Sequence, residues 1–312
     1  MKIVFFGSSE FAVPALKNIN KHFDIACIAT QPDKPKGRGL HKAQTPIKIV
    51  ARELGYPVIQ PINLKNHDFL NHIKSLKVDI GIVISYGKIL PQELLDIPKF
   101  GFINIHAGLL PKYRGASPVN TSIKNGDITT GTTIIKVSHE LDAGDIIMQA
   151  EIPIEHNDNA DSIFDKLSDL GGELIIRALK EYEEKGFCAS YVQDHSKCSY
   201  AHKIKKEDCL INWNDSSKNI FNFIRSLSSL PCAHTHYKEK NLKIYKSEII
   251  DFQTDSKIPG EIAGIIKKQG IVVKTNDGCL LIQDLQIENS KRMPAQSFLC
   301  GFKDNLIGEI LK

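Results

Sequence analysis

The amino-acid sequence predicts an α/β protein with a doubly wound, mostly parallel sheet, followed by a smaller C-terminal β-barrel of OB-like type. Two observations predict this fold class. Short apolar runs alternate with segments of helical spacing in the first half of the chain, whereas the last third holds short apolar runs divided by Gly, Pro, Asn and Asp. The 312 residues, 42% hydrophobic and 24% charged, provide for about two domains of ~150 residues each.

The first elements set the pattern. Lys2 to Phe6 is an apolar run that ends at Gly7, and apolar residues at helical spacing follow from Phe11 to Ile19, which predicts strand, turn and helix. The same reasoning predicts one further helix and three further strands, namely the helix Ile47–Leu54 and the strands Asp24–Thr30, Val78–Ser85 and Phe102–His106. Ligands of such sheets bind beyond the carboxyl ends of the strands. We therefore expect functional residues directly after the apolar runs.

The pattern of apolar and polar residues changes in the second half of the chain. A strongly amphipathic segment, Asp161–Tyr182, predicts a helix that closes the first domain. The polar stretch that follows resembles a linker, which gives a first domain at 1–186, a linker at 187–208 and a second domain at 209–312. The second domain is predicted to hold a helix and four barrel strands, namely Ile220–Leu227, Asn241–Ile250, Pro259–Ile266, Gly270–Lys274 and Cys279–Gln286.

Composition excludes several classes of protein. Seven cysteines without a CxxC pair fit neither a disulfide framework nor a zinc clip, and they favour a reduced, cytoplasmic compartment. No apolar run reaches the ~18 residues of a membrane span, so we expect no anchor or signal peptide. Residues 1–200 hold 23 Lys and Arg against 23 Asp and Glu, while 201–312 hold 17 against 13, so the net charge of +4 lies in the last third. A basic region of this kind attracts polyanions, although it is also ordinary for lysine-rich proteins.

The strand Phe102–His106 carries the first candidate catalytic residues. Its period of two places Asn104 and His106 on the same face at the carboxyl end of a sheet strand. A satisfied polar pair that caps the strand would explain them as well. The Gly- and Pro-rich segment that follows, 107–118, nevertheless holds apolar and basic side chains that a solvated loop does not need, which indicates a binding loop.

A second group of polar residues follows the run Thr132–Val137. There Leu141-Asp142-Ala143-Gly144-Asp145 places two acids in a glycine turn, and we expect Asp142 to reach His106. An acid beside a histidine and an amide donor such as Asn104 would together bind an oxyanion and manage one proton, as acyl transfer requires. An Asx-turn that only caps the loop is the alternative for Asp142. No activated Ser or Cys is evident in these loops, which favours direct transfer between two bound substrates.

The spacing of the residues argues against two other kinds of site, a metal site and a nicotinamide site. His106 and Asp142 lack a third ligand and an HExxH pattern, so we expect no metal. Gly7-Ser8-Ser9-Glu10 follows the first strand but lacks G-x-G-x-x-G, which argues against a nicotinamide site.

The basic loop after the second strand carries four fixed positive charges, at Lys34, Lys36, Arg38 and Lys42. A solvated charge run explains it as well as a segment that tracks phosphates into the site does. The residues alone leave both interpretations open.

Six motifs spread over almost the whole chain resemble the formyl-tetrahydrofolate-dependent formyltransferases. They are FFGSSEFAVPAL, TQPDKPKGRG, SYGKILP, INIHAGLLPKYRGASP, LDAGD and KRMPAQSFLCGF. The Asn-x-His, LLP and LDxGD patterns are shared by the whole group and fit sugar-nucleotide or glycinamide ribonucleotide formyltransferases too. The GRG loop and the KRMPAQ segment are particular to members that act on methionyl-tRNA.

The resemblance implies a Rossmann-like catalytic domain that transfers the formyl group of formyl-tetrahydrofolate to the amino group of methionyl initiator tRNA for translation initiation. It implies Asn104, His106 and Asp142 as the catalytic set, with no metal. The implied folate pocket includes Ser85, Tyr86, Gly87, Leu90, Gly108, Leu109, Leu110 and Pro111. The implied tRNA contacts are Lys34, Lys36, Arg38 and Lys42, together with the basic second domain. We expect a monomer.

Some residues depart from the family pattern. Gly108 stands where many members have Ser, and Ala143 where many have Thr, so we expect altered pocket contacts without loss of function. His139 has no assigned role and is expected to be exposed. A sugar-nucleotide formyltransferase and a non-catalytic RNA- or folate-binding protein remain the alternatives.

Overall fold

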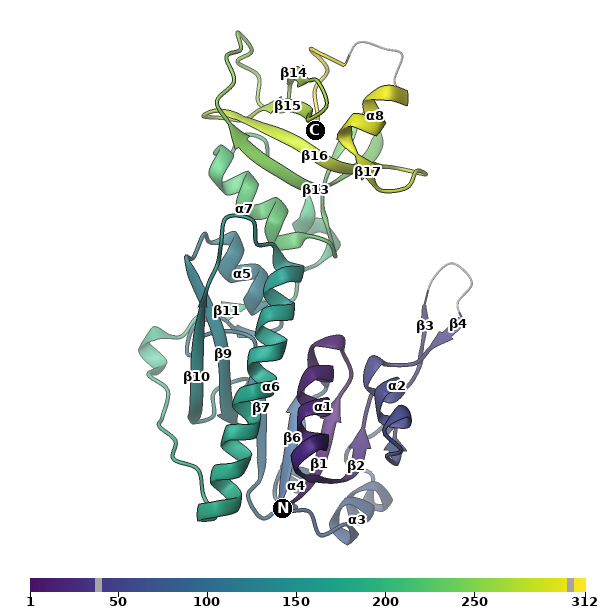
Figure 1. Cartoon of the computed structure of the whole chain (residues 1–312), viewed down its shortest axis with the longest axis vertical. Coiled ribbons are helices and arrows are strands. Elements are labelled where there is room, and N and C mark those ends of the chain that lie inside the picture. The colour runs from purple at the N-terminus through teal and green to yellow at the C-terminus, as the bar shows by residue number, and fades with distance from the viewer. Residues whose placement is uncertain (37–40, 302–305) are drawn as a thin grey trace. The chain divides into compact units, whose positions relative to one another are not determined.

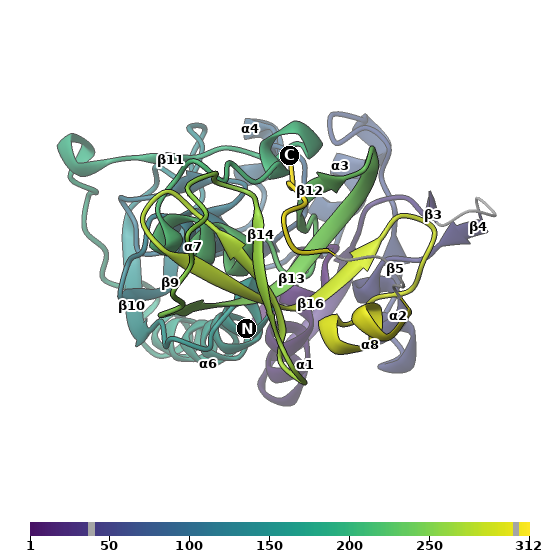
Figure 2. The same cartoon turned by 90° about the horizontal axis from the view of Figure 1, so that it is seen from above.

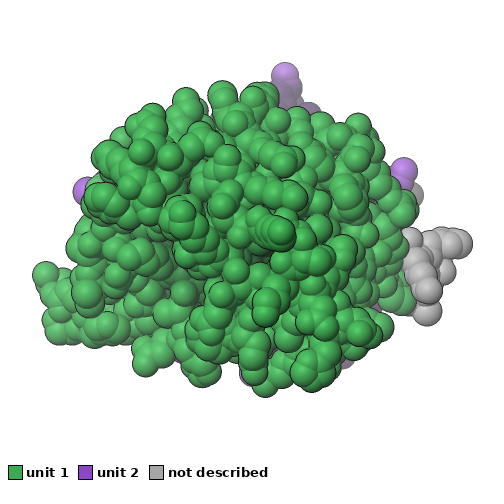
Figure 3. Space-filling view, turned by 90° about the horizontal axis from the view of Figure 1, so that it is seen from below, with its two compact units in different colours: residues 1–115, 129–152, 164–201 green, residues 116–128, 153–163, 202–312 purple. Residues whose placement is uncertain are grey.

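A computed structural model of the chain describes residues 1–36, 41–301 and 306–312, and it divides into two compact units. Unit 1 comprises residues 1–115, 129–152 and 164–201, whose atoms form one continuous body in Figure 3, and unit 2 comprises residues 116–128, 153–163 and 202–312. The segment 187–208, interpreted as a linker, therefore divides between the two units after residue 201. The boundaries drawn at 186 and 209 stay a prediction.

Unit 1 is built on a seven-stranded sheet in the order β10-β9-β7-β6-β1-β2-β5 (Figure 1). The strands are β1 Lys2–Gly7, β2 Asp24–Ala29, β5 Val58–Ile59, β6 Ile80–Ile84, β7 Phe102–His106, β9 Thr129–Lys136 and β10 Ile146–Pro153. Pairing is parallel from β5 through β2, β1 and β6 to β7, and antiparallel between β7 and β9. This arrangement confirms the predicted mostly parallel sheet.

Both faces of this sheet are covered, as the alternating side chains of β1 demonstrate. Ile3 and Phe5 pack into one apolar cluster, and Val4 and Phe6 pack into another on the opposite face. The first cluster takes side chains from α1 Val13–His22, α2 Pro46–Glu53 and α6 Ala160–Lys185, and the second takes them from α3 His67–Ser75 and α4 Gln92–Leu95. The sheet is therefore doubly wound, as the sequence predicts.

Unit 2 holds a separate antiparallel sheet in the order β12-β13-β16-β15-β14, with β17 paired to β16. Its elements are α5 Pro118–Lys124, α7 Ser217–Leu227, β12 Ala233–Tyr237, β13 Lys240–Ile250, β14 Ile262–Ile266, β15 Gly270–Lys274, β16 Cys279–Ile287, β17 Met293–Pro294 and α8 Ala295–Gly301. Figure 2 shows the long strands β13 and β16 running beside each other. One side of α7, with Ile220 and Ile224, packs into the core of this sheet together with Trp213.

Two short strand pairs lie outside the large sheets. β3 (Lys34–Lys36) pairs antiparallel with β4 (His41–Ala43), and β8 (Arg114–Gly115) pairs parallel with β11 (Tyr200–Ala201). The strands β3 and β8 belong to segments that leave the carboxyl edge of the parallel sheet, since β3 follows β2 and β8 follows β7.

Candidate active site

The carboxyl ends of β1, β2 and β6 are joined by polar contacts. The amide of Gln31 donates to the carbonyl of Tyr86 at 3.0 Å, and the Gln31 backbone N–H donates to Ser8 Oγ at 3.1 Å. Thr30 Oγ1 and Thr45 Oγ1 lie 2.7 Å apart. The loops after three adjacent strands are thus held together at the sheet edge where ligands of this architecture bind.

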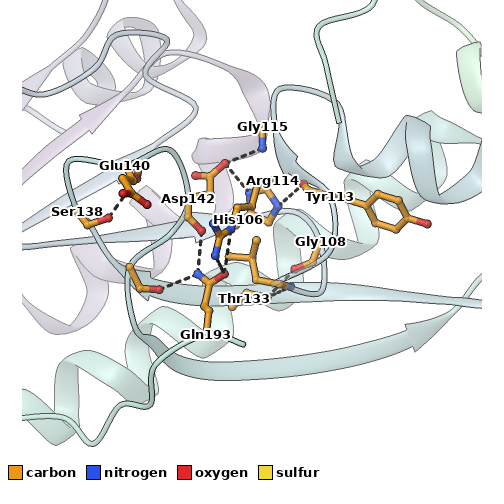
Figure 4. A network of polar contacts seen from close by, with 12 residues as sticks. His106, Gly108, Tyr113, Arg114, Gly115, Thr133, Ser138, Glu140, Asp142 and Gln193 are labelled. Atoms are coloured by element: carbon orange, nitrogen blue, oxygen red, sulfur yellow. Dashed lines mark hydrogen bonds and ion pairs between the residues drawn. The ribbon is translucent and has the colours of Figure 1, made fainter. Parts of the chain in front are cut away.

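Asn104 and His106 lie two residues apart on β7 and share the face that the sequence predicts. Asn104 is half-buried, and its side chain has no hydrogen-bond partner among the described residues of the protein. His106 is buried, with Nδ1 3.5 Å from Asp142 Oδ2 and Nε2 3.0 Å from the carbonyl oxygen of Tyr113 (Figure 4). The strand end therefore presents one unused amide beside a histidine paired with an acid.

The protonation of His106 follows from these partners. A carbonyl oxygen can only accept, so Nε2 carries a proton, and the neutral ring turns the Nδ1 lone pair toward Asp142. Burial lowers the pKa of His106 below its ordinary value, the charge of Asp142 opposes this shift, and Arg114 adds to it. His106 is thus a neutral base near pH 7, and a proton gained at Nδ1 would lie against a carboxylate.

The turn that carries Asp142 has a demanding backbone. Asp142 adopts a φ of 50°, in the left-handed region, and its Oδ2 accepts the Gly115 N–H at 2.9 Å. A Cβ at Gly144 would collide with the carbonyl oxygen of Lys136, so only glycine fits there. The glycine of the LDAGD pattern thus permits the close approach, and the carboxylate contacts both His106 and Gly115 of the binding loop.

The binding loop predicted after β7 is held by Thr133 of β9. Thr133 Oγ1 donates to the Gly108 carbonyl at 2.6 Å and accepts the Leu110 N–H at 3.2 Å. Gln149 of β10 donates to the Leu110 carbonyl at 2.8 Å, and the Tyr113 N–H donates to Ser199 Oγ at 3.0 Å. The loop backbone is therefore fixed to two neighbouring strands and to the segment before β11.

The two halves of the predicted folate pocket follow adjacent parallel strands, β6 and β7. After β6, Ser85 and Gly87 are exposed, whereas Tyr86 and Leu90 pack into the apolar cluster under the sheet. After β7, Gly108 and Leu110 are buried, whereas Leu109 and Pro111 are half-buried. The exposed residues Ser85 and Gly87 and the unpartnered Asn104 amide fit a ligand rich in hydrogen-bonding groups, such as a folate.

The predicted tRNA loop begins as a hairpin whose base is fixed by a polar network. Lys48 Nζ contacts Asp33 Oδ2 at 2.6 Å and Gln60 Oε1 at 2.7 Å, and Gln60 donates to Asp33 Oδ1 at 2.7 Å. Lys48 is 7% exposed, and together with Gln60 it lowers the pKa of Asp33. The sequence predicts a loop here, but its arms pair as β3 and β4.

The four predicted tRNA contacts can be placed only in part. Lys34 is exposed on β3, Lys36 and Lys42 lie on the paired arms of the hairpin, and Arg38 lies outside the described residues. His139 is exposed, as expected.

Sequence reasoning missed Gln193, Arg114 and Thr133 as parts of this site. Arg114 lies inside the motif INIHAGLLPKYRGASP, and its burial to 2% exposure inside a polar loop was not expected. Gln193 belongs to the segment interpreted as a linker, so nothing in its surroundings marked it. Thr133 is one of several threonines on β9, and only the cross-strand contact distinguishes it.

Among the described residues, no group of three or more His, Cys, Asp or Glu side chains could hold a metal ion. Within residues 1–36, 41–301 and 306–312, no helix combines the length and apolar character needed to cross a bilayer.

Comparison with known proteins assigns the family. Residues 1–179 match the model described as formyl transferase, and residues 203–303 match that of the formyl transferase C-terminal domain. The methionyl-tRNA formyltransferase of Fusobacterium nucleatum is 40% identical over 311 residues, covering 100% of both chains, and that of Sulfurihydrogenibium sp. is 42% identical over 305 residues, covering 97% of both.

Two solved structures share the fold. An N-formyltransferase from Helicobacter canadensis, in complex with folinic acid and dTDP-3-aminofucose, has a TM-score of 0.65 at 21% identity and covers 92% of this chain and 100% of its own. HypX from Aquifex aeolicus in complex with tetrahydrofolic acid has a TM-score of 0.67 at 18% identity and covers 96% of this chain and 47% of its own. With both domains matched and relatives at about 40% identity along its whole length, the chain belongs to the formyl transferase family.

Proposed function

We propose that Asn104, His106 and Asp142 carry out formyl transfer from formyl-tetrahydrofolate to the amino group of methionyl initiator tRNA, which yields formylmethionyl-tRNA for translation initiation. The observation that carries the assignment is the His106–Asp142 pair beside the unpartnered Asn104 amide at the end of β7. The family and its methionyl-tRNA formyltransferase relatives supply the reaction.

The bonds change as follows. The methionyl amine attacks the formyl carbon, a new C–N bond forms, the amine gives a proton to His106, and the C–N bond to the folate breaks as that proton passes on to the departing folate nitrogen. The oxygen on the formyl carbon gains negative charge meanwhile, and the free N–H groups of Asn104 are suited to donate to it. Formyl-tetrahydrofolate supplies the formyl group and the leaving amine.

His106 and Asp142 manage the proton. Because burial keeps His106 neutral, its Nδ1 can accept the amine proton, directly or through water. The Asp142 carboxylate, 3.5 Å from Nδ1, then stabilises the imidazolium that forms. The Tyr113 carbonyl holds the opposite ring nitrogen and fixes the orientation of the ring throughout.

Ser85 to Leu90 and Gly108 to Pro111 are proposed to hold the folate from the ends of β6 and β7. Tyr86 and Leu90, both buried in the apolar cluster beneath, would support the pocket from below. Lys34, Lys36, Arg38 and Lys42 are proposed to meet the tRNA phosphates together with the basic second domain, since the last 112 residues carry the whole net charge.

The protein is proposed to act as a cytoplasmic monomer. All seven cysteines are free, which suits a reducing compartment, and every proposed catalytic residue comes from one unit of one chain.

Assay of the purified protein with saturating formyl-tetrahydrofolate tests this function. We expect formylmethionyl-tRNA from charged initiator tRNA and no comparable product from a nucleotide-linked amino sugar. A preference for the sugar amine would identify a sugar formyltransferase. Tight binding of tRNA or folate without turnover would identify a non-catalytic binding protein.

A further inference from the structure

Gln193 contacts both the Asp142 turn and Arg114 of the binding loop. It lies outside both matched family domains, because the first match ends at residue 179 and the second begins at 203. Its side chain is 3% exposed. The segment around it is fixed on both sides: Tyr191 pairs with Ile146 through two backbone hydrogen bonds of 2.9 Å, and the Ser199 carbonyl accepts the Arg114 N–H at 2.8 Å.

The carboxamide of Gln193 uses its full hydrogen-bonding capacity within the protein. Its NH₂ group donates to the carbonyl of Asp142 at 2.8 Å and to that of Gly144 at 2.7 Å. Its Oε1 accepts from Arg114 Nε at 3.1 Å and from Arg114 Nη2 at 2.6 Å (Figure 4). Because carbonyls only accept and a guanidinium only donates, the opposite amide orientation would lose all four contacts.

These four contacts join the two segments that define the proton-handling pair. Asp142 holds a left-handed backbone, which persists only where its surroundings impose it. Arg114 lies between Tyr113, whose carbonyl accepts from His106, and Gly115, whose N–H donates to the Asp142 carboxylate. Gln193 therefore fixes the Asp142 turn against the loop that orients His106.

We propose that Gln193 is a positioning residue for formyl transfer. It keeps the Asp142 turn in the position from which the carboxylate faces His106. This inference rests on the proposed catalytic role of Asp142 and His106. Gln193 touches neither substrate in this proposal and acts entirely through Asp142.

Gln193→Glu tests the proposal with little change of shape. The carboxylate can still accept from Arg114, but it cannot donate to the Asp142 and Gly144 carbonyls. We expect kcat for formylmethionyl-tRNA synthesis to fall by ~10²-fold, because a small misplacement of a catalytic group has that effect. The KM values for tRNA and for formyl-tetrahydrofolate should stay within about twofold of wild type.

A control variant makes the same chemical change elsewhere. In Gln286→Glu, an amide that donates to the Ser290 carbonyl at 2.8 Å and accepts from Tyr245 Oη at 2.8 Å becomes a carboxylate in unit 2. We expect a lower unfolding midpoint with unchanged kcat. All rates are divided by the concentration of folded protein, so a variant that is merely less stable does not imitate a loss of kcat.

The Asp142→Asn background distinguishes positioning from general support of the fold. If Gln193 acts through the Asp142 carboxylate, adding Gln193→Glu to Asp142→Asn should cost less than about threefold in single-turnover rate. An equal loss in both backgrounds would overturn the proposal, as would an unchanged kcat in the single variant. Failure of the wild-type protein to formylate methionyl-tRNA would instead overturn the proposed function, and this inference with it.

Discussion

Both ring nitrogens of His106 face protein groups, and this pairing determines what a single residue can do here. Nε2 donates to the Tyr113 carbonyl, while Nδ1 lies 3.5 Å from Asp142. A neutral ring gains little from the carboxylate, whereas a protonated ring forms an ion pair with it. The contact therefore strengthens at the moment when the amine gives up its proton, which is the behaviour expected of a transition-state interaction.

Asn104→Ala is expected to lower kcat by ~10²- to 10³-fold, about 3 to 4 kcal/mol, with little change in tRNA affinity, because it removes an oxyanion donor. Steady-state formylation kinetics measure this. Asn18→Ala is a matched control, since that amide lies on α1 and accepts a contact from Lys21 of the same helix. A change in KM alone would contradict the assigned role.

His106→Ala and Asp142→Ala should each lose as much turnover as Asn104→Ala. Because the three side chains are proposed to act as one unit, the triple variant should be scarcely slower than the slowest single variant. Single-turnover rates of all four proteins provide the comparison. Multiplicative losses would mean that the residues act independently.

His106 should also make stability depend on pH. Its folded pKa lies below the unfolded value of about 6.5, so the unfolded chain takes up the proton first as the pH falls. The free energy of unfolding that this residue contributes is fully present above the unfolded pKa, and it is lost as the pH falls through the folded pKa. The loss is about 1.4 kcal/mol for each pH unit between the two pKa values. Urea unfolding at about pH 7.5 and about pH 5.5 should show a smaller difference for His106→Gln than for wild type. Equal differences would refute the assignment.

At the level of elements, the carboxyl ends of the parallel strands collect the site. β6 and β7 are neighbours in the sheet, so the loops that follow them, each with half of the proposed folate pocket, begin side by side. β2 leads into the β3–β4 hairpin, whose base is fixed by Lys48, Asp33 and Gln60. The hairpin therefore leaves the sheet edge from a rigid base.

Neutralising Lys34, Lys36 or Lys42 should weaken tRNA binding and leave formyl-tetrahydrofolate binding unchanged. Each lost phosphate contact should flatten the dependence of log K on log salt by ~0.9. Lys17→Gln on α1 removes the same charge from an exposed helix position and should leave the slope near wild type. Slopes equal to wild type in all loop variants would identify a merely solvated charge run.

Arg38→Lys should impair formylation of tRNA although the charge is kept, because lysine lacks the forked guanidinium that binds phosphates or base edges in two places. Gly37 and Gly39 flank this residue in the sequence. Formylation rates for Arg38→Lys and Arg38→Ala measure the effect against wild type. Equal rates for all three proteins would show that Arg38 does not contact tRNA, and the second domain alone would then support tRNA binding.

At the level of the whole molecule, the proposed catalytic set needs only one chain. Asn104, His106 and Asp142 all belong to unit 1. We expect sedimentation equilibrium to give the mass of a single chain over the range of concentrations used for activity. A dimer whose dissociation abolishes activity would contradict this.

Local patterns in the sequence accounted for most of the first unit. The apolar runs at Lys2–Phe6 and Phe102–His106 correspond to β1 and β7. They could be predicted because a buried parallel strand appears in the sequence as a short apolar run. The strands β5 and β10 and the helices α3 and α4 were not foreseen. With two and four residues, β5 and α4 are too short to carry a measurable period. The β3–β4 pairing was missed because basic side chains hide the strand pattern.

By itself, the sequence determined the class of fold, the family and the common face of Asn104 and His106, because periodicity and motif spacing are local properties of the chain. Tertiary structure alone decided which distant residues meet. The place of β9 beside β7 brings the Asp142 turn to His106, and the antiparallel contact of Tyr191 with Ile146 brings Gln193 to Asp142. The physical reason is that sheet order and loop pairing depend on the combined burial and hydrogen bonding of many separated segments, which no short stretch of sequence records.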